Sequence, residues 1–337
     1  MRKISFSDAI NEALREEMRR DPRVIVTGED VAGGATIRGF ERRDAWGGVF
    51  GVTRELVSEF GRDRVIDTPI SESAYLGAAI GAATQGYRTV TEIQFLDFIG
   101  VCLDQVVNQA AKLHYARGSK GSGIPLVIRA MVGAGVRAGG TQSQSFYSAM
   151  AHFPGIKVVA PANPADAKGL MLASIRDQDP VFFMEHKGLY ETSGEVPEGE
   201  HLVPLGRASV VREGEDVTVV AIARMVQVAE RAADLLKAEG IGVEIVDPRT
   251  IAPLDYATIS ASVAKTGRLV VVDEDTPRCS VASDIVGLVA SRDFDALRSA
   301  PSMVTAPHTP VPAAPELEDA YTPDADQVMA AIRKVVA

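Results

Sequence analysis

Short apolar runs alternate with helix-forming segments along this chain, and this alternation constrains the fold more than any other feature. Continuous apolar runs are typical of strands buried on both faces, as in parallel sheets covered by helices. In the first half of the chain the predicted strands are residues 24–28, 89–93, 124–130, 157–161 and 180–184. The predicted helices are residues 5–20, 54–60, 71–84, 96–117 and 165–175. The sequence therefore predicts an α/β fold built on a parallel sheet.

An acidic segment rich in glycine and proline, residues 188–206, interrupts this pattern. A second alternation follows, with predicted strands at 216–222, 243–247 and 268–274 and predicted helices at 225–239, 254–266 and 279–289. A chain of 337 residues also exceeds one typical domain. We therefore expect a first domain over 1–187, a linker over 188–206 and a smaller α/β domain over 207–337.

Composition excludes several classes of function. The net charge is −10 and no basic block is interleaved with aromatic residues, so we expect no nucleic-acid partner. No apolar run approaches the ~20 residues that span a bilayer, and the first ten residues lack the apolar core of a secretory signal. Cys102 and Cys279 stand far apart and the five histidines lack ligand spacing, so we expect neither disulfides nor a metal site. A cytoplasmic location is the resulting expectation.

The segment V-I-D-T-P-I-S-E-S, residues 65–73, places a carboxylate at a predicted helix start. Ser71 stands where an N-cap stands, and Glu72 falls in the first turn, where the helix dipole favours negative charge. Taken locally, Glu72 is a first-turn glutamate worth about 0.3–1 kcal/mol to the helix. Gly77 and Gly81 lie four residues apart, so we expect one face on which another backbone approaches closely.

Eight motifs in order give the chain a family resemblance. They are G-E-D-V (28–31), D-T-P-I-S-E-S (67–73), E-I-Q-F-L-D-F (92–98), D-Q-V-V-N-Q-A-A-K (104–112), G-I-K-V-V-A-P (155–161), D-A-K-G-L (166–170), I-R-D-Q-D-P-V (175–181) and D-P-R-T-I-A-P-L-D (247–255). The chain resembles the transketolase-like beta subunit of the thiamine-diphosphate-dependent first component of 2-oxo acid dehydrogenase complexes. Residues 44–53, 71–83, 100–105 and 185–190 are closest to the acetoin dehydrogenase branch.

This resemblance implies a pyrimidine-binding domain, a smaller transketolase-type C-terminal domain and an alpha-subunit partner in an α2β2 heterotetramer. Thiamine diphosphate lies between the subunits, and the alpha subunit holds Mg2+ and the diphosphate through a G-D-G motif. The sequence supports the need for a partner, because it contains no G-D-G followed by asparagines and no P-loop. The resemblance also implies a lipoyl acyltransferase core and a structural K+ on the main-chain carbonyls of Ile124, Asp177 and Asp179.

The resemblance assigns roles to four residues. Glu72 matches the glutamate that hydrogen-bonds the aminopyrimidine ring and promotes removal of the C2 proton. Glu29 is expected to support the same proton network, and a solvated loop position is its alternative. Gln94 and Phe98 are four residues apart, and we expect both in the opening turn of the long helix that ends near residue 117. They match positions that line the pyrimidine pocket in the family. A core position is the alternative for Phe98, and Tyr75 either lies near the cofactor or packs.

One motif departs from the family. The family reads R-G-G-H-Y-H-S-Q-S or R-A-A-A-Q-H-S-Q, whereas this chain reads R-A-G-G-T-Q-S-Q-S at 137–145. Gln142 therefore replaces a histidine that acts as proton donor and substrate ligand, and glutamine cannot carry a proton near neutral pH. Three interpretations remain open. Another group, such as His152 or one on the alpha subunit, supplies the proton, or the substrate needs only to be bound here. In the third, the chain serves another thiamine-dependent reaction, such as carboligation.

The function expected from these residues is a pyruvate dehydrogenase-like or acetoin dehydrogenase beta subunit. With its alpha subunit it cleaves a C–C bond beside a carbonyl and passes the acyl group to lipoamide. Three alternatives stay open: a thiamine-dependent carboligase subunit, a catalytically silent scaffold and an NAD-binding protein. The last is disfavoured because G-A-G at 133–135 lacks the third glycine of a dinucleotide fingerprint. His186 with Lys187 forms either an anion site or ordinary surface, and Arg249 is expected to hold domains or subunits together.

Overall fold

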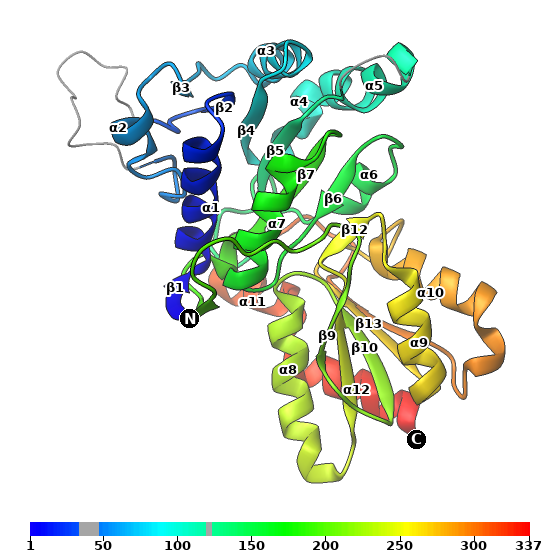
Figure 1. Cartoon of the computed structure of the whole chain (residues 1–337). Coiled ribbons are helices and arrows are strands. Elements are labelled where there is room, and N and C mark those ends of the chain that lie inside the picture. Colours follow the sequence, from blue (N-terminus) through cyan, green and yellow to red (C-terminus); the bar gives the residue numbers. More distant parts are fainter. Residues whose placement is uncertain (34–46, 119–122) are drawn as a thin grey trace. The chain divides into compact units, whose positions relative to one another are not determined.

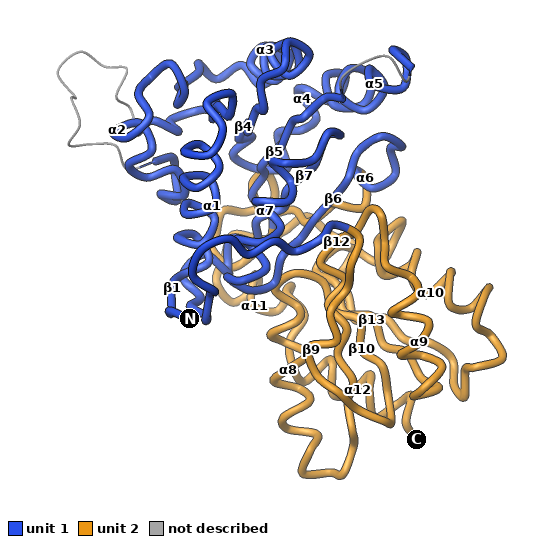
Figure 2. Tube along the Cα trace, viewed as in Figure 1, with its two compact units in different colours: residues 1–132, 150–205 blue, residues 133–149, 206–337 orange. Residues whose placement is uncertain are grey.

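The computed structural model describes residues 1–33, 47–118 and 123–337. These residues form two compact units (Figure 2). The first unit comprises residues 1–132 and 150–205, and the second comprises residues 133–149 and 206–337. No helix in the described ranges combines the length and the apolar character needed to cross a membrane.

A parallel sheet forms the centre of the first unit (Figure 1). Its strands lie in the order β6 (Lys157–Val159), β7 (Val181–His186), β5 (Leu126–Val132), β4 (Arg88–Phe95), β2 (Val24–Gly28) and β3 (Val65–Asp67). All neighbouring pairs in this order are parallel. Every residue of β5 and β7 is buried, as the continuous apolar runs predict.

Helices cover both faces of this sheet. The helices of the first unit are α1 (Phe6–Arg20), α2 (Leu56–Phe60), α3 (Glu72–Thr84), α4 (Ile99–Asp104), α5 (Ala111–Arg117) and α7 (Pro164–Arg176). Val90 belongs to the core cluster that α1 and α7 complete, whereas the hydroxyl of Thr89 donates to the Ala79 carbonyl of α3 at 3.4 Å. Because successive strand residues point to opposite faces, α3 and the α1–α7 pair lie on opposite sides.

The predicted helix at 96–117 is interrupted. Residues Leu96–Phe98 form a 3-10 turn, and a π-helical segment (Gln105–Ala110) separates α4 from α5. The preceding strand also extends to Phe95, through an irregular register after Ile93. The prediction that Gln94 and Phe98 share a helical turn is therefore wrong, because pairing with β5 keeps Gln94 in β4.

The helix α3 meets its neighbours through only one of its two glycines. A side chain at Gly77 would lie 3.1 Å from the Gln105 Oε1 atom of the π-helical segment, whereas nothing lies within 4 Å of the corresponding position at Gly81. The predicted approach of another backbone is therefore not found at either glycine within the described residues, and Gly77 instead leaves room for the Gln105 side chain.

The second unit contains a five-stranded sheet. Its order is β14 (Ser302–Thr305), β13 (Leu269–Asp273), β10 (Val217–Ala221), β11 (Val243–Asp247) and β9 (Ser209–Arg212). Only β9 runs antiparallel to its neighbour in this sheet. The helices that cover the sheet are α8 (Met225–Leu236), α9 (Tyr256–Thr266), α10 (Val281–Arg292) and α12 (Ala325–Val336), and a further helix of this unit is α11 (Pro315–Tyr321).

Three further short strands and one short helix lie in the described ranges. The strands are β1 (Arg2–Ser5), which pairs antiparallel with β8 (Ser193–Val196), and β12 (Thr250–Ala252). The helix α6 (Tyr147–Ala151) spans the point where the chain passes between the units. The predicted linker at 188–206 thus contributes a strand, β8, to the first unit.

Candidate functional site

Glu72 is the first residue of α3, directly after the turn that follows β3. It is 7% exposed and makes no side-chain hydrogen bond within the described ranges. Its first-turn position is as predicted, but the predicted cap is wrong: the Ser71 hydroxyl donates to the Pro69 carbonyl at 3.1 Å and accepts no helix N–H. The N-terminal N–H groups of α3 are therefore left without a side-chain cap, beside a buried carboxylate.

Glu29 lies at the same edge of the sheet. It follows β2, which pairs with β3 in a register that places Gly28 opposite Asp67. Burial, together with the negative charges of Glu72, Asp30 and Glu92, raises the pKa of Glu29 to about 6. The structure thus brings two of the predicted residues, Glu29 and Glu72, into one electrostatic environment. Glu29 holds its proton more tightly there than a glutamate in water does.

We expect Glu29→Gln to raise the free energy of unfolding at alkaline pH. The pKa of Glu29 lies near 6 in the folded chain and at 4.5 ordinarily, so its stabilising contribution is complete below 4.5 and is lost as the pH rises through 6. At about pH 8 the variant should be more stable by about 1–2 kcal/mol, and near pH 4.5 the difference should vanish. Urea unfolding at several pH values measures this, with exposed Glu191→Gln as the control. A difference independent of pH would refute the assignment.

Tyr75 points to the same cluster from the next turn of α3. It is 6% exposed, and its hydroxyl is buried without a hydrogen-bond partner in the described ranges. Burial raises the pKa of Tyr75, and the charges of Glu29 and Glu72 raise it further. Of the two interpretations of Tyr75, the structure favours the one beside the predicted site. Burial and Glu72 also raise the pKa of Cys102 to about 12, so this thiol stays protonated near neutral pH.

A buried ionic network lies under this edge of the sheet, and the sequence analysis missed it. The Arg129 side chain is 1% exposed and donates to Glu92 on β4 at 2.5 Å. It also donates twice to Glu185 on β7, from Nε at 2.6 Å and from Nη2 at 2.8 Å, and Tyr190 donates to the same carboxylate at 2.7 Å. A partial signal was present, since Arg129 interrupts the otherwise apolar strand β5, whereas Glu92 lies in a strand with several other polar residues.

The remaining predicted residues lie on other elements than those that carry Glu29 and Glu72. Gln94 is half-buried near the end of β4. Phe98 is half-buried in the 3-10 turn, with its ring edge-on to Phe95 at 5.6 Å between centroids. Gln142 is half-buried in the second unit, where its backbone N–H donates to the Gly139 carbonyl at 3.3 Å. His186 and Lys187, the alternative anion pair, are both buried, so the surface interpretation is wrong for them.

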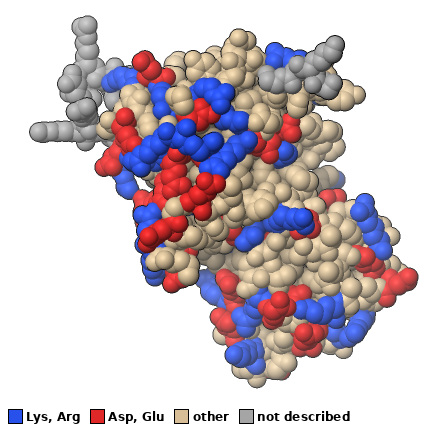
Figure 3. Space-filling view, viewed as in Figure 1, with Lys and Arg blue, Asp and Glu red and all other residues tan. Residues whose placement is uncertain are grey.

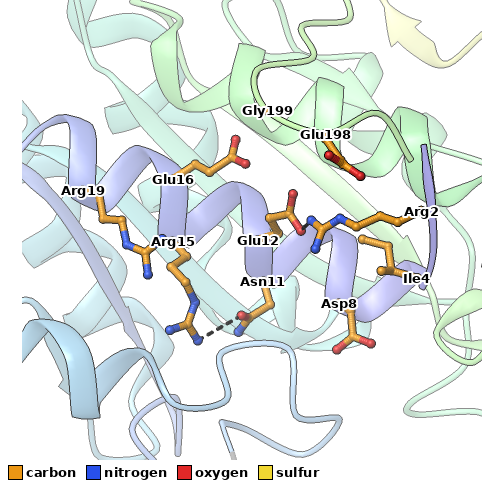
Figure 4. A pocket seen from close by; sticks show the side chains of 10 residues that line it. All are labelled: Arg2, Ile4, Asp8, Asn11, Glu12, Arg15, Glu16, Arg19, Glu198 and Gly199. Atoms are coloured by element: carbon orange, nitrogen blue, oxygen red, sulfur yellow. Dashed lines mark hydrogen bonds and ion pairs between the residues drawn. The ribbon is translucent and has the colours of Figure 1, made fainter. Parts of the chain in front are cut away.

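A groove of about 630 Å3 on α1 is a poor candidate for the site. It is lined by Arg2, Ile4, Asp8, Asn11, Glu12, Arg15, Glu16, Arg19, Glu198 and Gly199 (Figure 4). Its charges are paired within the chain, since Lys168 is fully buried and binds both Glu12 and Glu16. Acidic and basic side chains are also interspersed over the molecular face drawn in Figure 3. No predicted site residue lines the groove.

Two family models match the chain. The model described as "Transketolase, pyrimidine binding domain" matches residues 2–193, and "Transketolase, C-terminal domain" matches residues 206–328. A solved structure titled "Split gene transketolase, inactive beta4 tetramer" has a TM-score of 0.77 and 21% identity, and the match covers 99% of this chain and 98% of the other. That likeness shows the fold, and it confirms the predicted α/β class.

Curated relatives span the whole chain. The acetoin:2,6-dichlorophenolindophenol oxidoreductase subunit beta of Cupriavidus necator is 55% identical, over 99% of this chain and 98% of the relative. Its namesake from Bacillus subtilis is 52% identical, over 97% of this chain and 96% of the relative. The pyruvate dehydrogenase E1 component subunit beta of Bacillus subtilis is 40% identical, over 100% and 99%.

These matches confirm the resemblance read from the motifs. The relatives are named as beta subunits, and such a name implies an alpha subunit as partner in a multi-subunit complex. Thiamine diphosphate is the cofactor of this family, and the pyrimidine-binding model covers the unit that holds Glu29 and Glu72. The chain belongs to the family of beta subunits of thiamine-diphosphate-dependent acetoin and 2-oxo acid dehydrogenases.

Proposed function

We propose that this chain, with its alpha subunit, oxidatively cleaves acetoin at the C–C bond beside the carbonyl and passes the acyl group to lipoamide on an acyltransferase core. The observation that carries the proposal is Glu72, a buried carboxylate without a hydrogen-bond partner in the described ranges, at the start of α3. Acetoin is favoured over 2-oxo acids by the 55% identity to a beta subunit named for acetoin, against 40% for one named for pyruvate.

The residues at this edge of the sheet fit the aminopyrimidine ring of thiamine diphosphate. Ligands of α/β sheets bind outside the carboxyl ends of parallel strands, which is where β2 and β3 lead into Glu29 and Glu72. Glu72 would bind the ring through its carboxylate, and Gln94 and Phe98 would line the pocket. The alpha subunit would hold Mg2+ and the diphosphate. When bound, thiamine diphosphate supplies a nucleophilic carbanion at its thiazolium carbon.

The part played by this chain is to hold and move a proton at the ring. A carboxylate that faces a ring nitrogen stabilises the tautomer that carries a proton there. Because its pKa is raised to about 6, Glu29 exchanges a proton beside Glu72 closer to neutral pH than an ordinary glutamate does. Thiamine diphosphate titration of the α/β complex by calorimetry tests this: we expect Glu72→Gln to bind cofactor at least about tenfold more weakly, since a charge-assisted hydrogen bond is worth about 1.5–3 kcal/mol. Unchanged affinity would remove Glu72 from the site.

The proposed assembly is an α2β2 heterotetramer, with the alpha subunit seated against the face of α3. In support, Ile70 is 83% exposed directly before α3, and Val101 is 64% exposed in the neighbouring α4. The Ser73 hydroxyl donates to the Val101 carbonyl at 2.6 Å, so the two helices present these apolar side chains together. Exposed apolar groups of this kind are typical of surfaces that a partner covers.

The structural K+ at the carbonyls of Ile124, Asp177 and Asp179 is a further part of the proposal. Arg88 donates to the Asp177 carbonyl at 2.9 Å, and Lys157 lies 2.7 Å from the Asp177 carboxylate and 3.3 Å from that of Asp179. An ion bound there would share the Asp177 carbonyl with a guanidinium. The Asp177 and Asp179 carboxylates already pair with Lys157, so only part of their negative charge would balance the ion.

Gln142 is proposed to bind a neutral substrate. Acetoin carries no charge, whereas a 2-oxo acid carries a carboxylate that a protonated histidine can pair with. We therefore expect Gln142→His to raise kcat/KM for pyruvate relative to acetoin by about 10–100-fold, the effect of one hydrogen bond to a charged group. Steady-state kinetics of the α/β complex measures the ratio, with exposed Gln85→His as the control. An unchanged ratio would show that position 142 does not select the substrate.

Gln142 also supports a second function, a thiamine-dependent carboligase. A residue that cannot transfer protons suits a reaction in which the bound acyl group is joined to a second carbonyl compound rather than handed to lipoamide. The silent-scaffold alternative is opposed by the buried carboxylate pair of Glu29 and Glu72, because two uncompensated carboxylates are costly to retain without a ligand.

A further inference from the structure

The second unit contains a cavity that none of the assigned roles uses. It has a volume of about 380 Å3, within the ~300–1,000 Å3 typical of small-molecule sites. Its lining residues are Gly140, Gln144, Ser145, Phe146, Glu274, Asp275, Thr276, His308, Thr309, Pro310 and Tyr321. All of them belong to the second unit.

The cavity lies where an open α/β sheet is expected to bind a ligand. The chain passes from β10 to β11 on one side and then crosses to β13 on the other, so the strand order reverses between β10 and β13. Such a reversal opens a crevice at the carboxyl ends of the two strands. Glu274 and Asp275 directly follow β13, and Arg224 follows β10 within 4.0 Å of Glu274.

Negative charge dominates this crevice. Asp273, Glu274 and Asp275 are consecutive, and each is at most 6% exposed. Burial, with the charge of Asp275, raises the pKa of Asp273 to about 7, and burial raises the pKa of Asp275 to about 6. Neutral donors bind each of them: Tyr147 donates to Asp273, Ser148 donates to Asp275 at 2.7 Å, and the Ala134 N–H donates to Glu274 at 2.6 Å.

A second observation also points to a ligand. Ser145 lines the cavity, is 5% exposed, and its hydroxyl is buried without a hydrogen-bond partner in the described ranges. A hydroxyl left in this state costs free energy that a bound polar group or water recovers. Phe146 and Tyr321 also line the cavity and offer apolar contact to a ligand.

The sign of the charge selects the ligand. The lining contains two carboxylates, Glu274 and Asp275, and no lysine or arginine, so a phosphate or nucleotide would be repelled by like charge without a guanidinium or ammonium to bind it. Among the described residues no group of three or more metal-binding side chains is close enough to hold a metal ion. Aromatic rings beside carboxylates are the usual environment for an organic cation, through cation–π and charge-assisted contacts.

We propose that this cavity binds a small organic cation with a primary ammonium or guanidinium head and a short apolar stem. The carboxylates of Glu274 and Asp275 bind the head, the Ser145 hydroxyl accepts or donates one hydrogen bond, and the two rings contact the stem. The cation is either a free metabolite or a lysine or arginine side chain of a partner polypeptide. This site is inferred without recourse to the thiamine-dependent function proposed above, although the lining residues Gly140 and Gln144 flank Gln142 in the chain.

Calorimetric titration with agmatine tests the proposal, because agmatine carries both head groups on a butyl stem. The full-length chain and its complex with the alpha subunit are titrated in parallel, with n-butanol as the neutral probe. We expect one agmatine bound per chain and no binding of n-butanol. Binding that persists in the complex identifies a free cation as the ligand, whereas binding that is lost on assembly identifies a partner side chain.

Matched variants locate the binding. Asp275→Asn keeps an acceptor for Ser148 and should weaken agmatine binding at least tenfold, whereas Ser145→Ala should weaken it less, by about threefold to tenfold, as for one neutral hydrogen bond. Glu316→Gln removes the same charge from an exposed position outside the cavity and should leave binding unchanged. The proposal is overturned if the wild-type chain does not bind agmatine, or if Asp275→Asn and Glu316→Gln bind it equally.

Discussion

Replacing Glu72 by glutamine is expected to lower the rate of acetoin oxidation by the α/β complex about 10²–10⁴-fold, the usual cost of removing a group that transfers a proton in the transition state. Glutamine keeps the size of the side chain and its hydrogen-bonding capacity but cannot exchange a proton. The fold should be retained, because Glu72 makes no side-chain hydrogen bond in the described ranges and is the first residue of α3. Dye-linked acetoin oxidation at saturating thiamine diphosphate measures the effect.

The matched control for this variant is Glu191→Gln, which makes the same chemical change at an exposed position. Its activity should equal that of the wild type. Urea unfolding of both variants separates loss of chemistry from loss of folding. If Glu72→Gln retained more than about a tenth of the wild-type rate, the proton-transfer role assigned to Glu72 would be wrong.

Replacing Arg129 by methionine is expected to lower the free energy of unfolding by about 3–5 kcal/mol, the cost of removing one partner from a buried ion pair. Arg129 is 1% exposed and is the shared partner of Glu92 and Glu185. Without it the two carboxylates face each other in the interior, where burial already raises the pKa of Glu92. The variant should therefore recover part of its stability as the pH falls and Glu92 becomes protonated.

The control for Arg129→Met is Arg212→Met. Arg212 pairs with Asp234 at 2.6 Å, and the Asp234 side chain is 73% exposed. Loss of this surface pair should therefore lower the free energy of unfolding by only about 0–1 kcal/mol. Denaturant unfolding of the three proteins, at neutral and at acidic pH, measures both effects. Equal losses in the two variants would mean that the buried network contributes no more than a surface pair.

The sequence predicts the sheet of the first unit well because burial on both faces leaves a direct trace. The runs at 124–130 and 180–184 contain almost no polar residue, and the corresponding strands β5 and β7 are wholly buried. The resemblance assigned Glu29 and Glu72 to one proton network, and the structure places both after strands that pair in parallel, β2 and β3.

The features that the sequence analysis missed depend on contacts between distant segments. Arg129, Glu92 and Glu185 lie on three strands that are neighbours only in the folded sheet, so their pairing has no local pattern. The extension of β4 to Phe95 and the π-helical segment after α4 likewise follow from pairing with β5 and from packing against α3. Hydrophobic periodicity alone reads the latter stretch as one helix.

The cap at α3 illustrates how a local rule is overridden. Serine is a favoured N-cap residue, yet the backbone of Ser71 has φ −165° and ψ 65°, and its hydroxyl turns back to Pro69. The uncapped N–H groups at this end of the helix lie beside Glu72. Departures of this kind, where local preference is not followed, are typical of functional sites.

The most direct test of the central claim is the activity of the chain co-expressed with its alpha subunit. Reduction of an artificial electron acceptor is measured with acetoin, pyruvate and a branched 2-oxo acid, each with and without thiamine diphosphate. The account predicts reduction that requires thiamine diphosphate, is fastest with acetoin and is nearly abolished in Glu72→Gln. A stable complex that binds thiamine diphosphate but reduces no acceptor with any of the three substrates would contradict the dehydrogenase assignment and favour the carboligase.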